Sequence, residues 1–309
     1  MEHISVTNPI GLAMERVKQI LFRPFDLGKW FAIGFCAWLA GLGERGARGN
    51  FNTGSSNGQG GDIHQQFEHA RGYVLENLHW ILPLAIFCFV FVLALTVLFI
   101  WLNSRGKFMF LNCVALNRSD VVEPWKRFAD LANSLFWFRL VLALIGLLVT
   151  LPLIVFAILL AIPMFRNDSW NFGGIMVLIA LGVGIVLISV FFLLIRKLTT
   201  DFVVPIMYLR GSRCLAAWKE FRQLLGANFG GFLLYLLFQI VMVIVIGMIV
   251  LAVVLLTCCI AGCFMLIPYI GTVLLLPVIL FKRAYSLYYL AQYGPNYNVF
   301  QPAVTAAIS

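Results

Sequence analysis

Long unbroken stretches of apolar residues dominate the chain, and the polar residues gather between them. The clearest stretch runs from Gln223 to Leu280 and contains no Asp, Glu, Lys, Arg or His. A single membrane crossing needs about 20 residues, so a stretch of this length predicts two crossings. Gly262, Pro268 and Gly271 stand where the chain would turn between them.

Continuous runs of Leu, Ile, Val and Phe predict membrane-spanning helices, because the strands of a barrel would alternate apolar and polar residues. We therefore expect an all-α, polytopic protein with one transmembrane domain over residues 1–309. The six predicted spans are residues 27–43, 79–102, 136–162, 172–195, 229–258 and 264–283. The first is the weakest, because only Trp30–Leu42 is cleanly apolar between Lys29 and Glu44. It either crosses at a tilt or re-enters on the same side.

The composition supports this interpretation. Hydrophobic residues make up 62% of the chain and charged residues 11%, whereas a soluble domain has roughly 25% charged residues. The mean hydropathy of +0.95 is therefore typical of a chain whose solvent is largely lipid.

The basic residues predict the orientation. With a cytoplasmic N-terminus, 18 of the 22 Lys and Arg residues lie on the inner side, and Arg45, Arg48, Arg71 and Arg166 lie outside. Positive residues favour the cytoplasmic side, so we expect both termini in the cytoplasm. The net charge of +9 points to membrane lipids, anionic ones included, as partners and not to nucleic acid, since no nucleic-acid-reading motif is present.

The chain also contains an internal repeat. Ser119–Phe128 reads SDVVEPWKRF, and Ser212–Phe221 reads SRCLAAWKEF, so that Ser, Trp-Lys and Phe coincide at an offset of 212 − 119 = 93 residues. A more diverged copy, Asn8–Leu21, opens the chain as NPIGLAMERVKQIL, with Met14 at the tryptophan position. Such periodicity predicts repeated structural units.

Each unit is predicted to be an amphipathic helix in the membrane interface followed by a two-span hairpin. Asn8, Ser119 and Ser212 are expected to cap these helices, and positions 10, 14, 17 and 21 form the apolar face of the first. The units cover about residues 8–104 (with a Gly-rich external loop, 41–61), 119–200 and 212–292, and a cytoplasmic tail covers 293–309. Units with two spans share one orientation, so the three copies are parallel repeats related by rotation about the membrane normal.

In this order of interfacial helix and two-span hairpin, the chain resembles a group of bacterial six-span membrane families of unknown function. It is also similar in pattern to the membrane domain of some glycerophosphoryl diester phosphodiesterases. The stretch Thr200–Arg210, TDFVVPIMYLR, is similar to a feature of one family in that group. The resemblance implies a bacterial inner membrane. It brings no activity across, because the catalytic barrel of those enzymes has no counterpart here.

The second span of each unit leaves the membrane through two basic residues. If the repeats surround an axis, the three pairs converge on one pocket that would attract a phosphate or an anionic headgroup. Otherwise they are anchors that set the topology. The candidate contacts are Arg105, Lys107, Arg196, Lys197, Asp201, Lys282 and Arg283.

Two charged residues among the spans have simpler alternatives. Asp201 follows Lys197 by four residues, so the two are expected to pair along a helix, although a functional role for Asp201 stays open. Arg139, near the start of the third span, is expected to extend to the cytoplasmic interface.

No pattern predicts a catalytic residue, a cofactor or a metal. His64, His69 and His79 lack the HExxH spacing of a zinc site. Of the seven cysteines, the cluster Cys258, Cys259 and Cys263 either contains a disulfide or stays free.

These observations favour a non-enzymatic lipid-binding or scaffold protein. The first alternative is a transporter or channel for a small solute or lipid, which the scarcity of intramembrane charge disfavours. The second is a membrane enzyme of lipid metabolism, which would need a cluster of acid, base or metal ligands.

Overall fold

The structure is a computed structural model of the chain, and it describes residues 5–42, 77–166, 172–257, 262, 265 and 267–300. Within these residues the regular secondary structure is entirely helical, which confirms the predicted all-α class. Four helices are long and apolar enough to cross a membrane, as a membrane protein requires.

The four long helices correspond to four of the predicted spans, and α4 and α6 extend well beyond theirs. They are α4 (Leu78–Leu116), α6 (Ala129–Arg166), α7 (Phe172–Leu198) and α10 (Phe229–Leu256). Helix α7 continues through a π-helical turn, η2 (Thr199–Val203), into α8 (Val204–Arg210). The π turn lies just before Pro205 in the first turn of α8. Proline has no amide hydrogen, and a wider helical turn before it accommodates the missing hydrogen bond.

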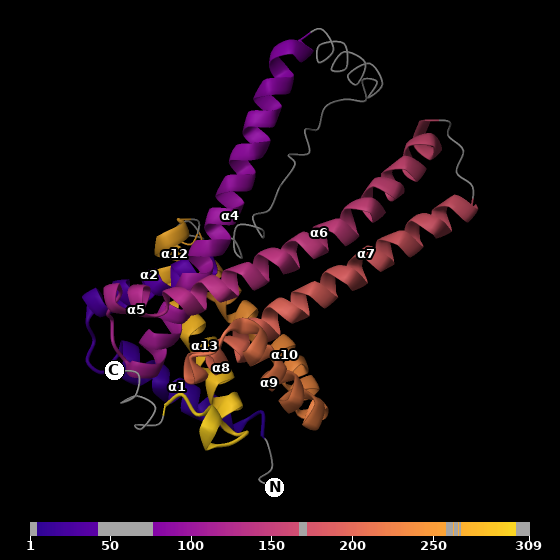
Figure 1. Ribbon diagram of the computed structural model, residues 1–309. Helices are drawn as coiled ribbons and strands as arrows, with labels where there is room; N and C mark the ends of the chain where they lie inside the picture. The colour runs from indigo at the N-terminus through magenta and orange to yellow at the C-terminus, as the bar shows by residue number, and fades with distance from the viewer. Residues whose placement is uncertain are drawn as a thin grey trace.

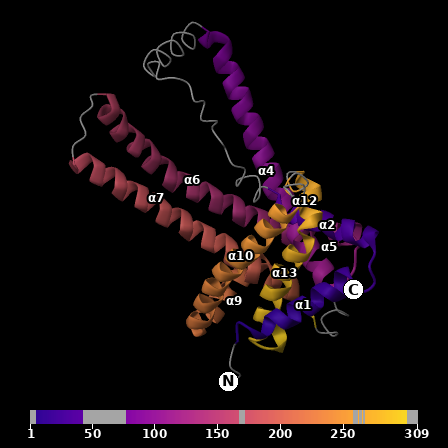
Figure 2. The ribbon, with the colours of Figure 1, turned by 180° about the vertical axis from the view of Figure 1, so that it is seen from behind.

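Helices α4, α6 and α7 extend away from a compact cluster that holds most of the other helices (Figure 1). Helices α6 and α7 lie side by side, and α4 diverges from them, as the view from behind also shows (Figure 2). In the most apolar window of each of these helices, 0% of the residues are buried within the protein. Phe89 is 68% exposed and Leu148 76% exposed, so these surfaces need lipid around them.

The first and sixth predicted crossings are not long helices in the structure. Helix α2 (Leu27–Gly41) has 15 residues, which corresponds to about 22 Å and is shorter than the ~30 Å hydrocarbon core. The sixth span is divided into α12 (Pro268–Leu274) and α13 (Leu276–Ala291). These two crossings therefore stay predictions.

The buried core consists of the ends of the long helices that lie in the compact cluster, and we call these the inner ends. Phe108 of α4, Phe202 of η2 and Tyr285 of α13 are each 0% exposed, and most of the next several residues of each element are buried too. Helices α4, α6 and α13 continue past the predicted spans, because these ends pack against one another.

A short amphipathic helix packs on each of these inner ends. Helix α5 (Val122–Arg127) contacts α4, α9 (Cys214–Ala227) contacts α8 and η2, and α1 (Asn8–Leu21) contacts α13. The repeat alignment places three buried residues at one position, Ala13, Pro124 and Ala217. It places three more at another, Val17, Phe128 and Phe221.

The predicted helix caps are wrong. Asn8 is already inside α1, whose first turn uses the Ser5 hydroxyl as an acceptor for the amides of residues 7 and 8. Helix α5 begins only at Val122 and α9 only at Cys214, and in neither helix does the N-cap residue form a side-chain cap. The first amide of α9, that of Cys214, instead donates to the hydroxyl of Ser134 on α6 at 3.0 Å.

The buried face of α1 is rotated about the helix axis relative to the predicted apolar face. Ala13, Val17 and Ile20 are buried, while Met14 is 47% exposed. Helix α1 packs on α13, and a small buried residue such as Ala13 permits a closer approach of two helices than methionine would.

Candidate functional site

A cavity of about 240 Å³ lies where the inner ends of five elements meet, and we call it the inner cavity. Its lining residues come from α2, α4, the α7–η2 segment, α10 and α13. They are Ala37, Ala40, Gly41, Lys107, Phe110, Lys197, Thr200, Asp201, Gln239, Ile279, Lys282 and Arg283.

Five of the seven candidate contacts from the sequence lie around the inner cavity. One comes from the first basic pair, one from the second and two from the third, and Asp201 joins them. The described lining therefore carries four cationic side chains and one carboxylate. An anion in this cavity would be attracted by several positive charges at short range.

The carboxylate of Asp201 holds one of these cations. Its Oδ2 lies 2.7 Å from Nζ of Lys197, which confirms the predicted pair. The same oxygen accepts a hydrogen bond of 3.0 Å from the Tyr235 hydroxyl, which in turn accepts one of 3.0 Å from the amide of Gln239. Asp201 therefore anchors a network that joins the α7–η2 segment to α10.

Thr200 positions two further cations. Its Oγ1 accepts a hydrogen bond of 2.6 Å from Nζ of Lys107 and donates one of 3.0 Å to the carbonyl of Arg196. Its own carbonyl accepts a hydrogen bond of 2.6 Å from Nη1 of Arg283. Lys107 of α4 and Arg283 of α13 thus meet at one residue of η2.

Arg283 carries the clearest sign of an incomplete site. The residue is 7% exposed, and its buried Nη2 makes no hydrogen bond within the described structure. A buried guanidinium nitrogen without an acceptor is costly, so such a group calls for an explanation.

The other two candidate contacts lie elsewhere. The guanidinium of Arg105 is 4.7 Å from the ring centre of Trp101 and 4.9 Å from that of Trp125, and its Nη1 donates to the carbonyl of Trp125 at 3.0 Å. Its role is therefore to hold α5 against α4. Arg196 lines a neighbouring cavity, because consecutive residues of a helix point in different directions.

The prediction that the side chain of Arg139 extends outward from its helix is wrong. Arg139 is 8% exposed and donates a hydrogen bond to the side-chain oxygen of Asn103 on α4. The long α6 begins at residue 129, so residue 139 lies more than two turns inside it, facing α4.

The sequence interpretation missed Thr200, Tyr235 and Gln239. Gln239 is 4% exposed and stands in the middle of a stretch with no charged residue. A polar side chain within a predicted span is itself a signal of a functional or packing role, and Tyr235 lies one turn before it.

The other sequence candidates yield no second chemical centre. Among the described residues, no group of three His, Cys, Asp or Glu side chains could hold a metal ion. His64, His69, Cys258, Cys259 and Cys263 lie outside the described residues. The described cysteines, Cys36, Cys88, Cys113 and Cys214, are free thiols.

The chain matches one known family model. A model described as "Family of unknown function (DUF7544)" matches residues 4–290. No curated protein and no solved structure matches the chain. The expected likeness to phosphodiesterase membrane domains therefore remains a prediction.

Proposed function

We propose that this chain, which belongs to the family of unknown function DUF7544, is a non-enzymatic membrane protein that binds an anionic lipid by its phosphate group. The phosphate would occupy the inner cavity. The observation that carries the proposal is Arg283, whose Nη2 is buried at the cavity without an acceptor.

A phosphate fits the donors present. Arginine presents paired N–H groups that match phosphate oxygens, and lysine supplies a compact positive charge. Lys107 belongs to α4, and Lys282 and Arg283 belong to α13; these two helices are far apart in the chain, yet their cations line one cavity. The described lining of this cavity carries four cations and one carboxylate, and this excess of positive charge favours a further bound anion.

The surroundings favour a lipid as the source of that anion. The inner cavity lies at the inner ends of α4, α7 and α10, whose outer parts are apolar and exposed. A bilayer lipid can place its headgroup at such a boundary while its chains stay beside the helices. The clustering of basic residues at these ends supports a cytoplasmic location for the cavity and both termini. The resemblance to bacterial six-span families adds the proposal that the membrane is a bacterial inner membrane.

The architecture that supports this site is, we propose, a closed threefold repeat. Helix α5 packs on the end of α4, α9 packs on the end of α8, and α1 packs on the end of α13. In each case the amphipathic helix of one unit covers the inner end of the unit before it, with the first unit following the third. Such a ring would place the three basic pairs around a common axis.

Native mass spectrometry of the protein released from nanodiscs with phosphatidylglycerol tests the proposal. We expect a retained phosphatidylglycerol molecule, at least fivefold depleted in Arg283→Gln and in Lys107→Gln. Arg105→Gln is the matched control, since Arg105 lies outside the cavity. Equal retention in all three variants would contradict the proposal.

A second measurement separates a lipid from a soluble anion. Thermal unfolding is followed in neutral detergent with added phosphatidylglycerol or with inorganic phosphate. Stabilisation by the lipid at micromolar concentration, lost in Arg283→Gln, supports lipid binding. If inorganic phosphate alone stabilises the protein, the ligand of the inner cavity is a soluble phosphate compound and not a lipid.

A further inference from the structure

A groove of about 610 Å³ lies between the first turns of α6 and the start of α9, and we call it the α6–α9 groove. Its lining residues come from these two helices and from the residue just before α9. They are Asp130, Asn133, Ser134, Trp137, Phe138, Val141, Arg213, Cys214 and Leu215. None of them was a candidate contact from the sequence.

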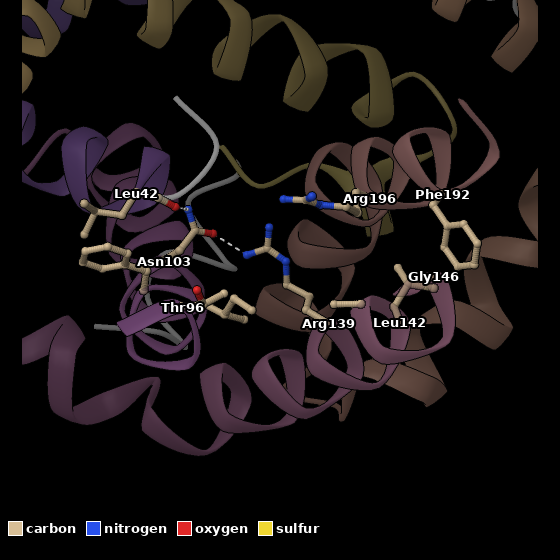
Figure 3. Close-up of a pocket in the computed structure, with 11 residues that line it drawn as sticks. Leu42, Thr96, Asn103, Arg139, Leu142, Gly146, Phe192 and Arg196 are labelled. Atoms are coloured by element: carbon tan, nitrogen blue, oxygen red, sulfur yellow. Dashed lines mark hydrogen bonds between the residues drawn. The ribbon is translucent and has the colours of Figure 1, made fainter. Parts of the chain in front are cut away.

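The groove occupies one face of α6, and the opposite face of the helix packs elsewhere. Successive residues of an α-helix are about 100° apart, so Ser134, Trp137 and Val141 form a single stripe. Arg139 and Gly146 lie about half a turn away from this stripe and line the neighbouring cavity towards α4 and α7 (Figure 3). The contact of α6 with α4 therefore leaves the stripe uncovered, and Trp137 is 62% exposed.

The two walls of the groove are held together by a hydrogen bond and by packing. The backbone amide of Cys214 donates to the hydroxyl of Ser134 at 3.0 Å. Cys214 is 1% exposed, and the ring centres of Phe138 and Trp218 lie 5.9 Å apart. The start of α9 is thus fixed against α6, and the spacing of the groove walls is set by two packed helices.

The groove changes from polar to apolar along α6. Asp130 and Asn133 lie in the first turns of the helix, and Trp137 and then Val141 follow. From residue 130 to residue 141 the helix rises about 16 Å, which is comparable with one leaflet of a bilayer, roughly 20 Å thick. Tryptophan favours the membrane interface. The lining therefore follows the order of headgroup, interface and acyl chain in one lipid.

Two opposite charges stand at the polar end of the groove. Arg213 is exposed and immediately precedes α9, and Asp130 is exposed on α6. Both side chains line the groove, without an ion pair between them in the described structure. The first turn of α9 adds the partial positive charge of a helix N-terminus beside Arg213. The groove thus offers one positive and one negative place to a ligand.

A zwitterionic headgroup complements this arrangement. A phosphate matches the guanidinium of Arg213 with paired hydrogen bonds. A primary ammonium has three N–H donors for the carboxylate of Asp130, whereas a quaternary ammonium has none. A headgroup whose only charge is a phosphate would be repelled by Asp130. The charges of the groove therefore favour an ethanolamine headgroup over a choline or a glycerol headgroup.

We propose that the α6–α9 groove binds a bilayer lipid with a phosphoethanolamine headgroup. Its phosphate would contact Arg213 and the start of α9, and its ammonium would contact Asp130. Its acyl chains would lie along Trp137 and Val141. This proposal is independent of the anionic lipid proposed for the inner cavity, because the two sites share no lining residue.

The test uses the full chain in nanodiscs of unlabelled phosphatidylcholine that contain one diazirine-labelled probe lipid at a time. The probes are phosphatidylethanolamine, phosphatidylcholine and phosphatidylglycerol with the same labelled acyl chain, and peptide mass spectrometry locates the crosslinks. We expect phosphatidylethanolamine to label the peptides that contain Trp137, Val141 and Leu215 about fivefold more than either other probe, as one charged contact allows.

Charge variants test the two named contacts. Arg213→Gln and Asp130→Asn should each reduce the labelling of these peptides by phosphatidylethanolamine about fivefold. Asp130→Asn should also raise their labelling by phosphatidylglycerol about threefold, because the repulsion of its phosphate is removed. A merely structural role of Asp130 would not produce this gain.

Two further variants are matched controls. Arg222→Gln changes an exposed arginine of α9 outside the groove, and Arg283→Gln changes the inner cavity. Both should leave the labelling of the groove peptides unchanged. Equal labelling by phosphatidylethanolamine and phosphatidylcholine, no gain for phosphatidylglycerol in Asp130→Asn, or a fivefold loss in either control would each overturn the proposal.

Discussion

Gly106 of α4 lies directly against the backbone of Ala40 in α2, and a Cβ at position 106 would overlap that backbone and come within 2.9 Å of Cβ of Leu39. At the other end of α2, the side chain of Lys29 donates a 2.8 Å hydrogen bond to the side-chain oxygen of Asn117, just after α4. Helix α2 therefore runs antiparallel to the inner end of α4, beside residues 103–117 and not beside the apolar part of that helix. This explains why a 15-residue helix is sufficient there.

The close contact predicts a strong effect of one methyl group. Gly106→Ala should force α2 and α4 apart and lower the free energy of unfolding by about 1–3 kcal/mol, the usual cost of overpacking. Reversible unfolding in mixed micelles measures the change. Gly182→Ala is the control, with open space around the new methyl group. Equal stability of the two variants would show that α2 does not pack here.

Asp201 provides a prediction about charge. Asp201→Asn removes the only described carboxylate of the inner cavity, so the affinity for phosphatidylglycerol should rise about fivefold, which corresponds to roughly 1 kcal/mol. Thermal stability should fall, because Lys197 loses its partner. Titration with phosphatidylglycerol measures the affinity. Glu220→Gln, which removes the pair of Glu220 with Arg210 at 3.0 Å, is the control. If the affinity for phosphatidylglycerol falls together with the thermal stability, Asp201 has a structural role instead.

Arg16 provides a prediction about the contact between α1 and α4. Its guanidinium donates to the carbonyls of Val114 and Ala115, the shortest of these bonds being 2.7 Å. Burial lowers the pKa of Arg16, yet arginine stays protonated at neutral pH.

Arg16→Ala should leave those helix-end carbonyls without a partner and destabilise the contact by about 1–3 kcal/mol. Hydrogen exchange of α1 and of the last turns of α4 should accelerate. Lys18→Ala, on the exposed face of the same helix, should leave the exchange unchanged.

Cys214 provides a prediction about pH. Burial raises the pKa of the Cys214 thiol to about 12. Only the thiolate reacts, and at pH 9, about three units below that pKa, roughly one thiol in a thousand is ionised. Cys214 should therefore resist maleimide at both pH 7 and pH 9 in the folded protein, as site-resolved mass spectrometry can measure. A cysteine introduced at the neighbouring Leu215, which is 73% exposed, should react faster at pH 9 than at pH 7.

The sequence by itself determined the helical class, four membrane-length helices and the Lys197–Asp201 pair. Each of these depends on residues close together in the chain: an apolar run of sufficient length, or two charges one helical turn apart. It also indicated which basic residues to examine, because they gather where the apolar runs end.

The tertiary structure alone decided which of those residues share a cavity. Arg105 is drawn away by Trp101 and Trp125, Arg139 is buried by its contact with Asn103, and Thr200 brings Lys107 and Arg283 together. Hydropathy indicates only that a helix is apolar. Which side of one helix packs against another depends on contacts between residues far apart in the chain, such as that of Gly106 with α2. Those contacts are a property of packing in three dimensions, so no local pattern in the chain encodes them.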